Sequence, residues 1–409
     1  MLATANIFDV AIAGAGPAGT SAAIQLAMDG ARVLLVEEKR FPRPKLCGEF
    51  ISPECLAHFQ RLGVRDQMLS AGGTSLAQTV FYSRRGHSVD VPSEWFKSGT
   101  NALGLSRSEM DFKLLDRAKS AGVVVIEGVH AAGLIRERER VSGIRVKPAH
   151  ANGGSGSNDY SAVVTIDATG RARSLARHVD KGTAALKKRE RPKLVAFKVH
   201  LEKARVAAGA CEIYFYRGGY GGLSGVEGGI SNLCFIVSAD DVRRYSSDPE
   251  IVMREVVMKN ARAAQTLNAA SASTPWLSVS LEGFGKRELA PADGLLTVGD
   301  AAAFIDPFTG SGMLMALESG QVAAQTVAGH LPALRSGGSF DLLTKQYRSE
   351  YATRFNSRLQ VSGFLRRAAF VPGLAEAAIL LCGPSARLRR KLARATRPSA
   401  KVRPTTSPS

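Results

Sequence analysis

The sequence has few cysteines and few tryptophans, and it has fewer acidic than basic residues. Its five cysteines form no C-x-x-C pair and no even-numbered framework, which excludes a disulfide scaffold and gives no support to a structural zinc site or a redox dithiol. The histidines are scattered without ligand spacing, so we expect no metal site. We therefore expect the protein to work in a reducing compartment, the cytoplasm.

Long apolar runs are also absent. The longest, at 368–382, is interrupted by Pro372, Gly373 and Glu376, and it falls short of the roughly 20 residues that a spanning helix needs. Near the N-terminus, residues 9–13 already have the pattern of a strand, and no basic segment precedes them. We therefore expect no secretory signal, and a chain that can lie on a membrane but not cross one.

The deficit of acidic residues is concentrated at one end of the chain. With 54 Lys+Arg and 36 Asp+Glu the formal net charge is +18, and residues 366–409 supply half of it, with ten basic residues against one acidic residue, Glu376. No aromatic residue follows Phe370, whereas segments that bind nucleic acid usually interleave aromatics for base stacking. We expect no nucleic-acid partner. A solvated tail and a peripheral contact with an anionic membrane both stay open.

The strongest chemical signal is a glycine-rich turn between two expected strands, at 9–13 and 33–36. Gly14 permits the tight turn, Gly16 lets the backbone approach a pyrophosphate, and Gly19 allows close helix packing. The acidic pair 37–38 ends the second strand, where Glu37 can accept hydrogen bonds from an adenosine ribose. Strand, turn, helix and acid in this order predict a dinucleotide site.

A second motif favours FAD over NAD. A strand at 295–298 leads to Asp300, and a turn rich in proline and glycine then leads into a helix near Gly312. Asp300 can accept hydrogen bonds from ribityl hydroxyls, and backbone N–H groups of such a turn can face an electron-rich ring edge.

Together the two motifs resemble those of flavoproteins with the p-hydroxybenzoate hydroxylase fold. Residues 165–177 resemble the D-x-x-G-x-x-S segment of that family, which implies that Asp167 and Gly170 lie near the pyrophosphate. The family's aromatic hydroxylases usually have glycine and histidine where this chain has Ala168 and Ala303, which argues against a typical aromatic hydroxylase. Arg107, at the start of an expected helix, matches an arginine that the family places close to the cofactor.

A third block narrows the resemblance. Residues 41–54, F-P-R-P-K-L-C-G-E-F-I-S-P-E, resemble a segment of the geranylgeranyl-reductase-like flavoproteins, which implies that Lys45, Cys47 and Gly48 lie beside the isoalloxazine. Residues 218–233 resemble the same group's G-Y-x-W segment, with Gly222 in place of tryptophan. The halogenase signature W-x-W-x-I-P is absent.

Two of these residues are candidates for catalysis, each with a plainer alternative. Cys47 is expected to act as a redox or acid–base thiol, or else to be an inert buried cysteine. Tyr220 is expected to donate a hydrogen bond in the substrate cavity, or else only to pack. The motifs and the resemblance together predict the following cofactor-binding residues: Gly14, Gly16, Pro17, Ala18, Gly19, Glu37, Glu38, Lys45, Cys47, Gly48, Arg107, Asp167, Gly170, Gly299, Asp300, Pro307, Gly310, Ser311, Gly312 and Met313.

The fold class expected from these patterns is α/β. It comprises a Rossmann-like FAD-binding domain (residues 1–75, 101–179 and 283–330) interleaved with a mainly β substrate-binding domain (76–100 and 180–282), C-terminal helices (331–395) and a disordered basic tail (396–409). In more detail, we expect a β-meander from 123–127, 129–135 and 141–146, a flexible loop at 151–158, a hairpin at 217–229 and one amphipathic helix at 248–268.

The function expected is that of an FAD-dependent oxidoreductase acting on a small hydrophobic substrate. The resemblance implies hydride delivery from reduced FAD to a double bond of an isoprenoid- or polyketide-like compound, with NAD(P)H approaching transiently as the hydride donor. Two alternatives stay open: a monooxygenase that works through a C4a-hydroperoxide of the flavin, and an FAD-binding adaptor for a membrane or a partner.

Overall fold

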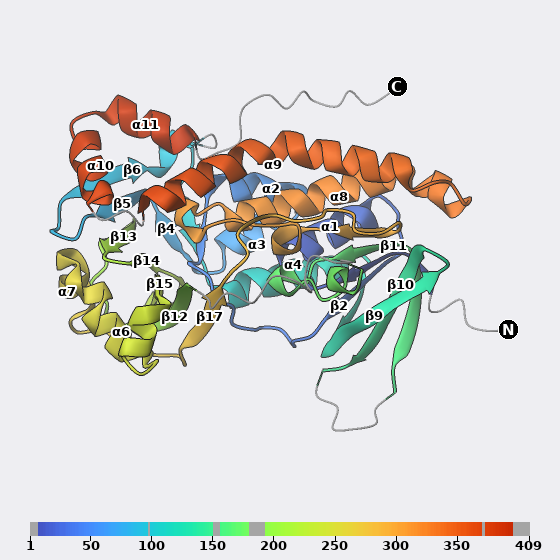
Figure 1. The fold of residues 1–409 in the computed structure, drawn as a ribbon, viewed down its shortest axis with the longest axis horizontal. Helices are drawn as coiled ribbons and strands as arrows, with labels where there is room; N and C mark the ends of the chain where they lie inside the picture. The colour runs from blue at the N-terminus through green and yellow to red at the C-terminus, as the bar shows by residue number, and fades with distance from the viewer. Residues whose placement is uncertain (1–6, 97–98, 150–155, 180–192, 370–372, 396–409) are drawn as a thin grey trace.

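The structure is a computed structural model that describes residues 7–96, 99–149, 156–179, 193–369 and 373–395. The expected basic tail at 396–409 lies outside the described residues, as does most of the expected loop at 151–158. Two large sheets, one helical layer and a C-terminal helical extension make up the described part (Figure 1).

The first sheet carries the nucleotide-binding half. Its parallel part has the order β8, β2, β1, β11, β19, and the hairpin of β9 and β10 pairs with the first half of β11 in antiparallel fashion. Residues 10–13 of β1 and 33–36 of β2 are continuous apolar runs because both faces of the sheet are covered. The strands are β1 (Ile7–Ala13), β2 (Val33–Glu37), β8 (Val124–Glu127), β9 (Val129–Glu137), β10 (Arg140–Pro148), β11 (Asn158–Asp167) and β19 (Leu295–Thr297).

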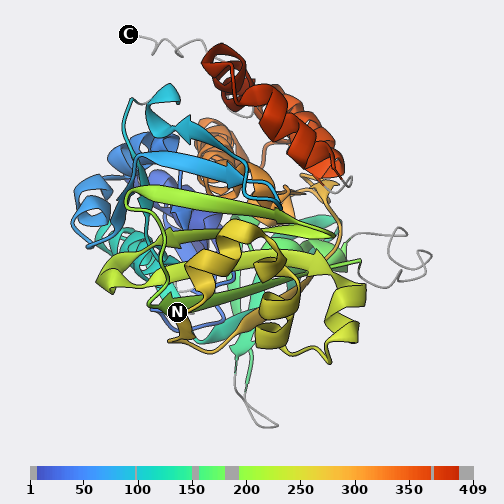
Figure 2. The same cartoon turned by 90° about the vertical axis from the view of Figure 1, so that its left-hand side faces the viewer.

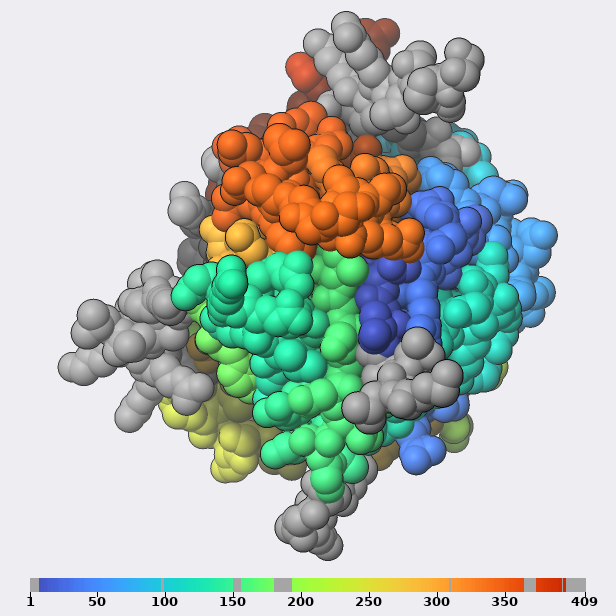
Figure 3. Space-filling view, turned by 90° about the vertical axis from the view of Figure 1, so that its right-hand side faces the viewer, coloured from blue at the N-terminus to red at the C-terminus, as the bar shows by residue number. Residues whose placement is uncertain are grey.

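The expected β-meander is only partly correct. Strands β9 and β10 form the expected hairpin and pack over one face of the parallel sheet, with Leu134 and Ile144 against Leu34 and Val36. Strand β8 instead pairs in parallel with β2, because the preceding helix forms a crossover connection that returns the chain to the sheet edge. Figure 3 shows this side, where the start of α9 lies next to the β9–β10 hairpin; the Arg140 guanidinium sits 5.8 Å from the centre of the Phe340 ring.

Helices cover the other face of this sheet. Helix α8 packs on α1 at a point of close backbone approach: a Cβ at Gly320 would lie 2.2 Å from the Ala18 carbonyl oxygen. Figure 1 shows α9 lying over α8, which in turn lies over α1. The helices of this layer are α1 (Pro17–Met28), α2 (Pro53–Leu62), α3 (Arg65–Leu69), α4 (Arg107–Ser120), α8 (Gly312–Arg335) and α9 (Asp341–Ala369). Two small sheets complete the described strands outside the two large sheets. One contains β3 (Phe50–Ile51), β4 (Thr74–Leu76) and β7 (Ala102–Gly104), and the other contains β18 (Gly285–Lys286) and β20 (Ala303–Phe304).

The second sheet has the order β16, β12, β15, β14, β13, β5, β6, with β17 also paired to β12. Side chains alternate between its faces. Tyr214 and Phe235 are on the face that packs against helices α6 (Pro249–Glu255) and α7 (Ala261–Leu267). Phe215 and Ile236 are on the opposite face, which lines a cavity. Its strands are β5 (Gln78–Tyr82), β6 (Ser88–Pro92), β12 (Leu194–Glu202), β13 (Ala210–Tyr216), β14 (Gly219–Gly225), β15 (Ser231–Ser238), β16 (Ser271–Ala272) and β17 (Leu277–Leu281).

The glycine-rich segment at 217–229 is mostly strand. Only Arg217 and Gly218 form the turn, and β14 follows as an interior strand. A Cβ at Gly219 would lie 1.9 Å from the Ile236 carbonyl oxygen, so glycine is required there by the close approach of β15.

The expected single helix at 248–268 is wrong. Helix α6 (Pro249–Glu255) and helix α7 (Ala261–Leu267) are separated by a turn that ends at Asn260, while α5 (Ala239–Arg244) precedes them. The Asn260 side chain accepts from the backbone N–H groups of residues 262 and 263 and donates to the carbonyls of Tyr82, Ser83 and Phe215. These long-range hydrogen bonds outweigh the helical periodicity of the segment.

The described part of the chain ends in two short helices, α10 (Leu374–Cys382) and α11 (Ala386–Ala395). They lie over β6 at one end of the molecule (Figures 1 and 2). Among the helices of the described residues, none combines the length and the apolar character needed to cross a membrane.

Candidate FAD and substrate site

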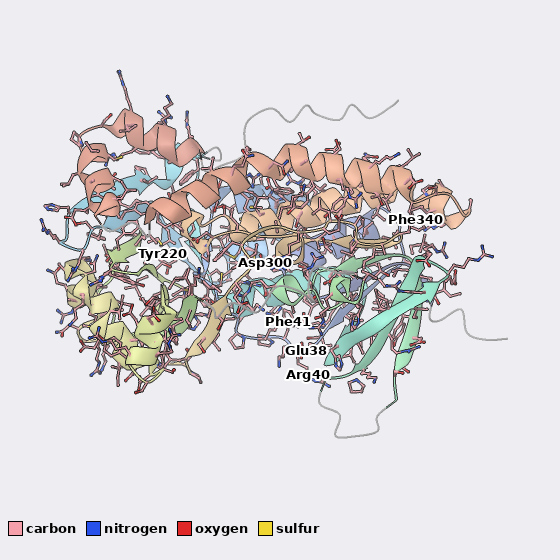
Figure 4. The ribbon with its side chains drawn as sticks, viewed as in Figure 1. Glu38, Arg40, Phe41, Tyr220, Asp300 and Phe340 are labelled. Atoms are coloured by element: carbon pink, nitrogen blue, oxygen red, sulfur yellow. The ribbon has the colours of Figure 1, made fainter. Side chains whose placement is uncertain are left out.

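One cavity of about 1720 Å³ runs between the two sheets and under the C-terminal helices. Sites for single small ligands usually occupy about 300–1,000 Å³, so this cavity has room for a dinucleotide and a second ligand. Three of the residues that line it are labelled in Figure 4: Glu38 directly follows β2, Asp300 lies near the middle of the molecule, and Tyr220 lies on the second sheet.

Most of the residues predicted from the sequence line this cavity. They are Gly14, Gly16, Pro17, Ala18, Glu37, Glu38, Lys45, Cys47, Gly48, Arg107, Gly170, Tyr220, Gly299, Asp300, Pro307, Gly310, Gly312 and Met313.

The glycine turn after β1 forms a cradle. Gly14 has φ +102°, and a Cβ there would lie 2.4 Å from the Ala168 carbonyl oxygen, so only glycine fits the turn. Gly16 is different, since a Cβ there would meet no atom within 4 Å. Gly16 caps α1 without a side-chain hydrogen bond, and the backbone N–H groups of the first turn of α1 face the open space. This arrangement fits a pyrophosphate.

The end of β2 forms the adenosine side of the cradle. One carboxylate oxygen of Glu37 accepts a hydrogen bond from the Ala15 N–H at 2.8 Å, and the other accepts from the Lys39 N–H at 3.1 Å. Arg43 crosses this end, with its Nε 3.5 Å from Glu37 Oε1. Its Nη1 lies 3.4 Å from Asp111 Oδ2, so two carboxylates hold this guanidinium at the cavity wall.

The turn after β19 forms the opposite wall. Gly299 and Gly310 have φ near +60°, and a Cβ at Gly299 would lie 2.9 Å from the Cβ of Ala18, so the two glycine motifs are packed directly against each other. Burial raises the pKa of Asp300, against the opposing effect of Arg171, Lys45 and Arg107. Helix α8 has no side-chain cap, and the N–H groups of Gly312 and Met313 begin it at the cavity wall.

Three predicted cofactor ligands do not line the cavity: Gly19, Asp167 and Ser311. Gly19 serves the packing of α1, because a Cβ there would lie 1.9 Å from the Gly14 carbonyl oxygen. Asp167 is fully buried, and its carboxylate accepts hydrogen bonds from the N–H groups of Thr169, Leu175 and Ala176. Asp167 therefore shapes the loop that presents Gly170 and does not itself face a cofactor.

The centre of the cavity is strongly basic. Burial, together with the guanidinium groups of Arg107 and Arg43, lowers the pKa of Lys45. Arg107 is held by a bidentate pair with Asp111, at 2.8 and 2.6 Å. The Cys47 Sγ accepts a hydrogen bond from the Glu49 N–H at 3.4 Å and interacts with the Arg107 guanidinium. An anionic cofactor would relieve the repulsion among these cations.

A buried charge cluster beside Cys47 was missed by the sequence analysis. Glu49 is fully buried at φ +54°, and its carboxylate accepts hydrogen bonds from Lys198 Nζ at 2.6 Å and from the Arg107 N–H at 2.8 Å, and lies 2.7 Å from His200 Nε2. Burial alone raises the pKa of a carboxyl, but His200 and Lys198 hold the pKa of Glu49 below its ordinary value of 4.5. The cluster joins the Cys47 loop to β12. The only signal in the sequence was the place of Glu49 in the third motif.

The far end of the cavity is an apolar chamber. Its walls carry Phe81, Phe215, Ile236, Phe304 and Ile379 from the second sheet, β20 and α10. Cys211 and Cys234 also line the cavity, and burial raises the pKa of Cys211 to about 12.

Tyr220 borders this chamber with its hydroxyl engaged. It donates to Asp306 Oδ1 at 2.6 Å, and burial and Asp306 together raise the pKa of Tyr220 well above its ordinary value. Asp306 also accepts from the Phe308 N–H, so it caps the turn before α8. A catalytic role for Tyr220 stays a prediction.

The comparisons with known proteins agree with this site. A family model described as an FAD binding domain matches residues 8–354. The digeranylgeranylglycerophospholipid reductase of Methanosarcina mazei is 27% identical over 329 residues, which cover 78% of this chain and 74% of that protein.

Two solved structures show the same fold. A geranylgeranyl bacteriochlorophyll reductase-like protein from Thermoplasma acidophilum has a TM-score of 0.77 at 20% identity, over 95% of this chain and 96% of its own. A myxobacterial chondrochloren halogenase has a TM-score of 0.75 at 20% identity, over 96% and 97% of the two chains.

The glycine cradle and the basic centre fit FAD, as the sequence predicted. Because the family model covers most of the chain, this protein belongs to the FAD-binding-domain family and is an FAD-dependent oxidoreductase of the p-hydroxybenzoate hydroxylase fold.

Proposed function

We propose that this enzyme reduces carbon–carbon double bonds of a long, apolar isoprenoid substrate. The observation that carries the proposal is the continuity of the cavity from the glycine cradle to the apolar chamber. A ligand in that chamber lies next to the cofactor site without crossing solvent. The name of the Methanosarcina relative, a reductase of a lipid with geranylgeranyl chains, supports an isoprenoid as the ligand.

The chamber suits an isoprenoid chain better than a polar aromatic compound. Phe81, Phe215 and Phe308 contact one another around it, with ring centres 5.6 to 6.4 Å apart. The hydroxyl of Tyr220 is engaged by Asp306, which leaves its ring as part of the wall. Burial of methyl and methylene groups against such walls contributes about 25 cal/mol per Å² and needs no polar partner.

Saturation of a double bond requires a hydride and a proton. When bound and reduced, FAD supplies the hydride. We assign the proton to Cys47, which lines the cavity between the cradle and the chamber and is held by the Glu49 N–H. The neighbouring Arg107 and the Glu49 cluster fix the loop that carries this thiol.

The test uses the FAD-loaded enzyme, reduced anaerobically with dithionite, NADH or NADPH, and mixed with a phospholipid that carries geranylgeranyl chains. We expect the flavin to be reoxidised without oxygen and the lipid to gain two hydrogens per saturated bond by mass spectrometry. Product that forms only with oxygen and gains an oxygen atom would instead identify a monooxygenase.

Two variants sharpen this test. Gly222 lines the chamber, and a Cβ there would contact only the flexible end of Ile213, at 3.2 Å, and the Glu212 carbonyl oxygen, at 4.0 Å. Gly222→Leu is therefore expected to fold and to bind FAD, but to lose turnover of the long-chain lipid because the new side chain fills the chamber. Cys47→Ala is expected to keep reduction of its flavin while product formation falls at least tenfold. Unchanged product formation in both variants would refute the proposed site.

A further inference from the structure

The two C-terminal helices carry an unusual concentration of exposed apolar side chains. Of the eleven large hydrophobic residues that are exposed in the described part of the chain, four lie between residues 374 and 388. They are Leu374, Leu380, Leu381 and Leu388, and Leu381 is the most exposed of all eleven, at 73%. Clusters of this kind mark surfaces that contact a partner or a membrane.

Helix α10 is apolar on both sides. Ala375, Ala378, Ile379 and Cys382, at the spacing of one helical face, line the chamber. Leu380 and Leu381 point away from it, at 53% and 73% exposure. The apolar character of the inner face follows from its place in the chamber wall, whereas no described residue covers the outer leucines.

Helix α11 adds a basic stripe beside these leucines. Arg387, Arg390, Lys391 and Arg394 follow the i, i+3, i+4, i+7 pattern of one helical face, and all four are exposed. In Figure 4 the nitrogen-tipped side chains of α11 project away from the body of the molecule. The fifth base of this helix, Arg389, points the other way and binds Asp90 Oδ1 at 2.6 Å.

A few polar contacts fix the pair of helices on the edge of the second sheet. Besides its bond to Asp90, Arg389 places its guanidinium 5.7 Å from the centre of the Trp95 ring, and Arg394 Nε donates to the Trp95 carbonyl. His87 Nε2 lies 3.8 Å from Glu376 Oε1. The leucines and the basic stripe are thereby held at one end of the molecule, over β6 (Figure 2).

We propose that the outer surface of α10 and α11 docks on an anionic phospholipid bilayer. The basic stripe is complementary to anionic headgroups, and the exposed leucines can enter the boundary with the acyl chains, as in helices that lie in a membrane interface. A bilayer fits better than an acidic protein because the inner face of α10 lines an apolar chamber, so docking brings that chamber next to the phase that holds apolar compounds. This inference goes beyond the proposed reduction, and binding is measured without substrate, so either can fail alone.

The experiment is vesicle flotation of the full-length, FAD-loaded protein. Vesicles of phosphatidylcholine alone are compared with vesicles that contain phosphatidylglycerol, at low and high salt. Binding is expected only to the anionic vesicles and is expected to weaken with salt. Arg390→Gln/Lys391→Gln is expected to bind about 30-fold more weakly, at roughly fivefold per basic residue near an anionic surface. Leu380→Ser/Leu381→Ser is expected to lose at least about tenfold through lost apolar burial.

Matched controls lie on other surfaces. Arg136→Gln/Arg138→Gln removes two exposed bases from the β9–β10 tip, and Leu342→Ser removes a leucine of α9 that is 66% exposed. Both are expected to bind like the wild type, and flavin content and melting temperature confirm folding of every variant. Absence of binding to anionic vesicles at low salt would overturn the proposal. It would also be overturned by equal binding to neutral vesicles, or by wild-type binding of both α10–α11 variants.

Discussion

The two glycines of the first motif are expected to respond in opposite ways to the addition of one methyl group. Gly16 has φ −72° and ψ 179°, an extended conformation open to any residue, and its Cβ position is empty to 4 Å. Alanine at this position should therefore leave the free energy of unfolding of the apoprotein within about 1 kcal/mol of the wild type, and reduced freedom of the unfolded chain can even raise it.

Gly16→Ala is expected to lower the affinity for FAD rather than the stability of the apoprotein. The methyl group occupies the space through which a pyrophosphate approaches the first turn of α1. Displacing that group weakens hydrogen bonds from backbone N–H donors to a charged acceptor, each worth about 1.5–3 kcal/mol. The loss of two such bonds amounts to about 3 kcal/mol or more, which corresponds to a Kd for FAD raised at least about 100-fold.

Gly14→Ala is the matched control. Its Cβ would lie 2.4 Å from the Ala168 carbonyl oxygen at φ +102°, so this variant should lose stability directly. Urea unfolding of the apoproteins, followed by circular dichroism, measures stability, and quenching of FAD fluorescence on titration measures Kd. A Gly16→Ala protein that binds FAD with the wild-type Kd would refute the placement of the pyrophosphate, as would an apoprotein as unstable as Gly14→Ala.

Three further predictions concern the walls of the site. Glu49→Gln leaves the buried Lys198 without its counter-charge and should lower the free energy of unfolding by about 3–5 kcal/mol in urea, while adding Lys198→Met to it should restore part of the loss. Since the pKa of Glu49 is lowered in the folded state, the stability that its ionised carboxylate contributes is complete above the ordinary pKa of 4.5 and is lost as the pH falls through the lower folded-state pKa. Urea unfolding midpoints measured from pH 7 to pH 3 should therefore decline less steeply for Glu49→Gln than for the wild type. Equal slopes for the two proteins would count against the stabilising role of the cluster. Tyr220→Phe removes a hydrogen bond to Asp306 and should cost about 1.5–3 kcal/mol in a thermal melt, with the FAD affinity unchanged.

The sequence predicted well those parts of the site that are encoded locally. The turns at Gly14 and Gly299 require backbone conformations that glycine adopts most readily, so the glycines of the two motifs indicate the turn geometry directly. The same holds for helix α4, which begins at Arg107 as expected and is capped locally by the Ser106 side chain. The FAD cofactor and the α/β fold class were confirmed for this reason.

What the sequence did not predict depends on residues distant in the chain. Glu49 and Lys198 are 149 residues apart, and only the docking of β12 against the Cys47 loop turns them into a pair. Asn260 interrupts an expected helix because its side-chain amide donates hydrogen bonds to carbonyls of β5 and β13, which no local sequence pattern indicates. Asp167 was assigned to the cofactor by position in a motif, whereas its hydrogen bonds serve its own loop.

The division between cofactor and substrate chemistry follows the same logic. The family model ends at residue 354, and the residues that close the apolar chamber, among them Ile379 and Cys382, come after it. The glycine cradle and Asp300 lie within the matched part, so FAD binding is common to the family. Helices α10 and α11 lie beyond it; the inner face of α10 forms part of the chamber wall, and the outer faces of the two helices carry leucines and bases. Substitutions in these helices should therefore change which substrate the enzyme accepts, and how the enzyme reaches that substrate, without changing the affinity for FAD. A chimera that exchanges residues 373–395 for those of a relative tests this division, and a lower FAD affinity of the chimera would refute it.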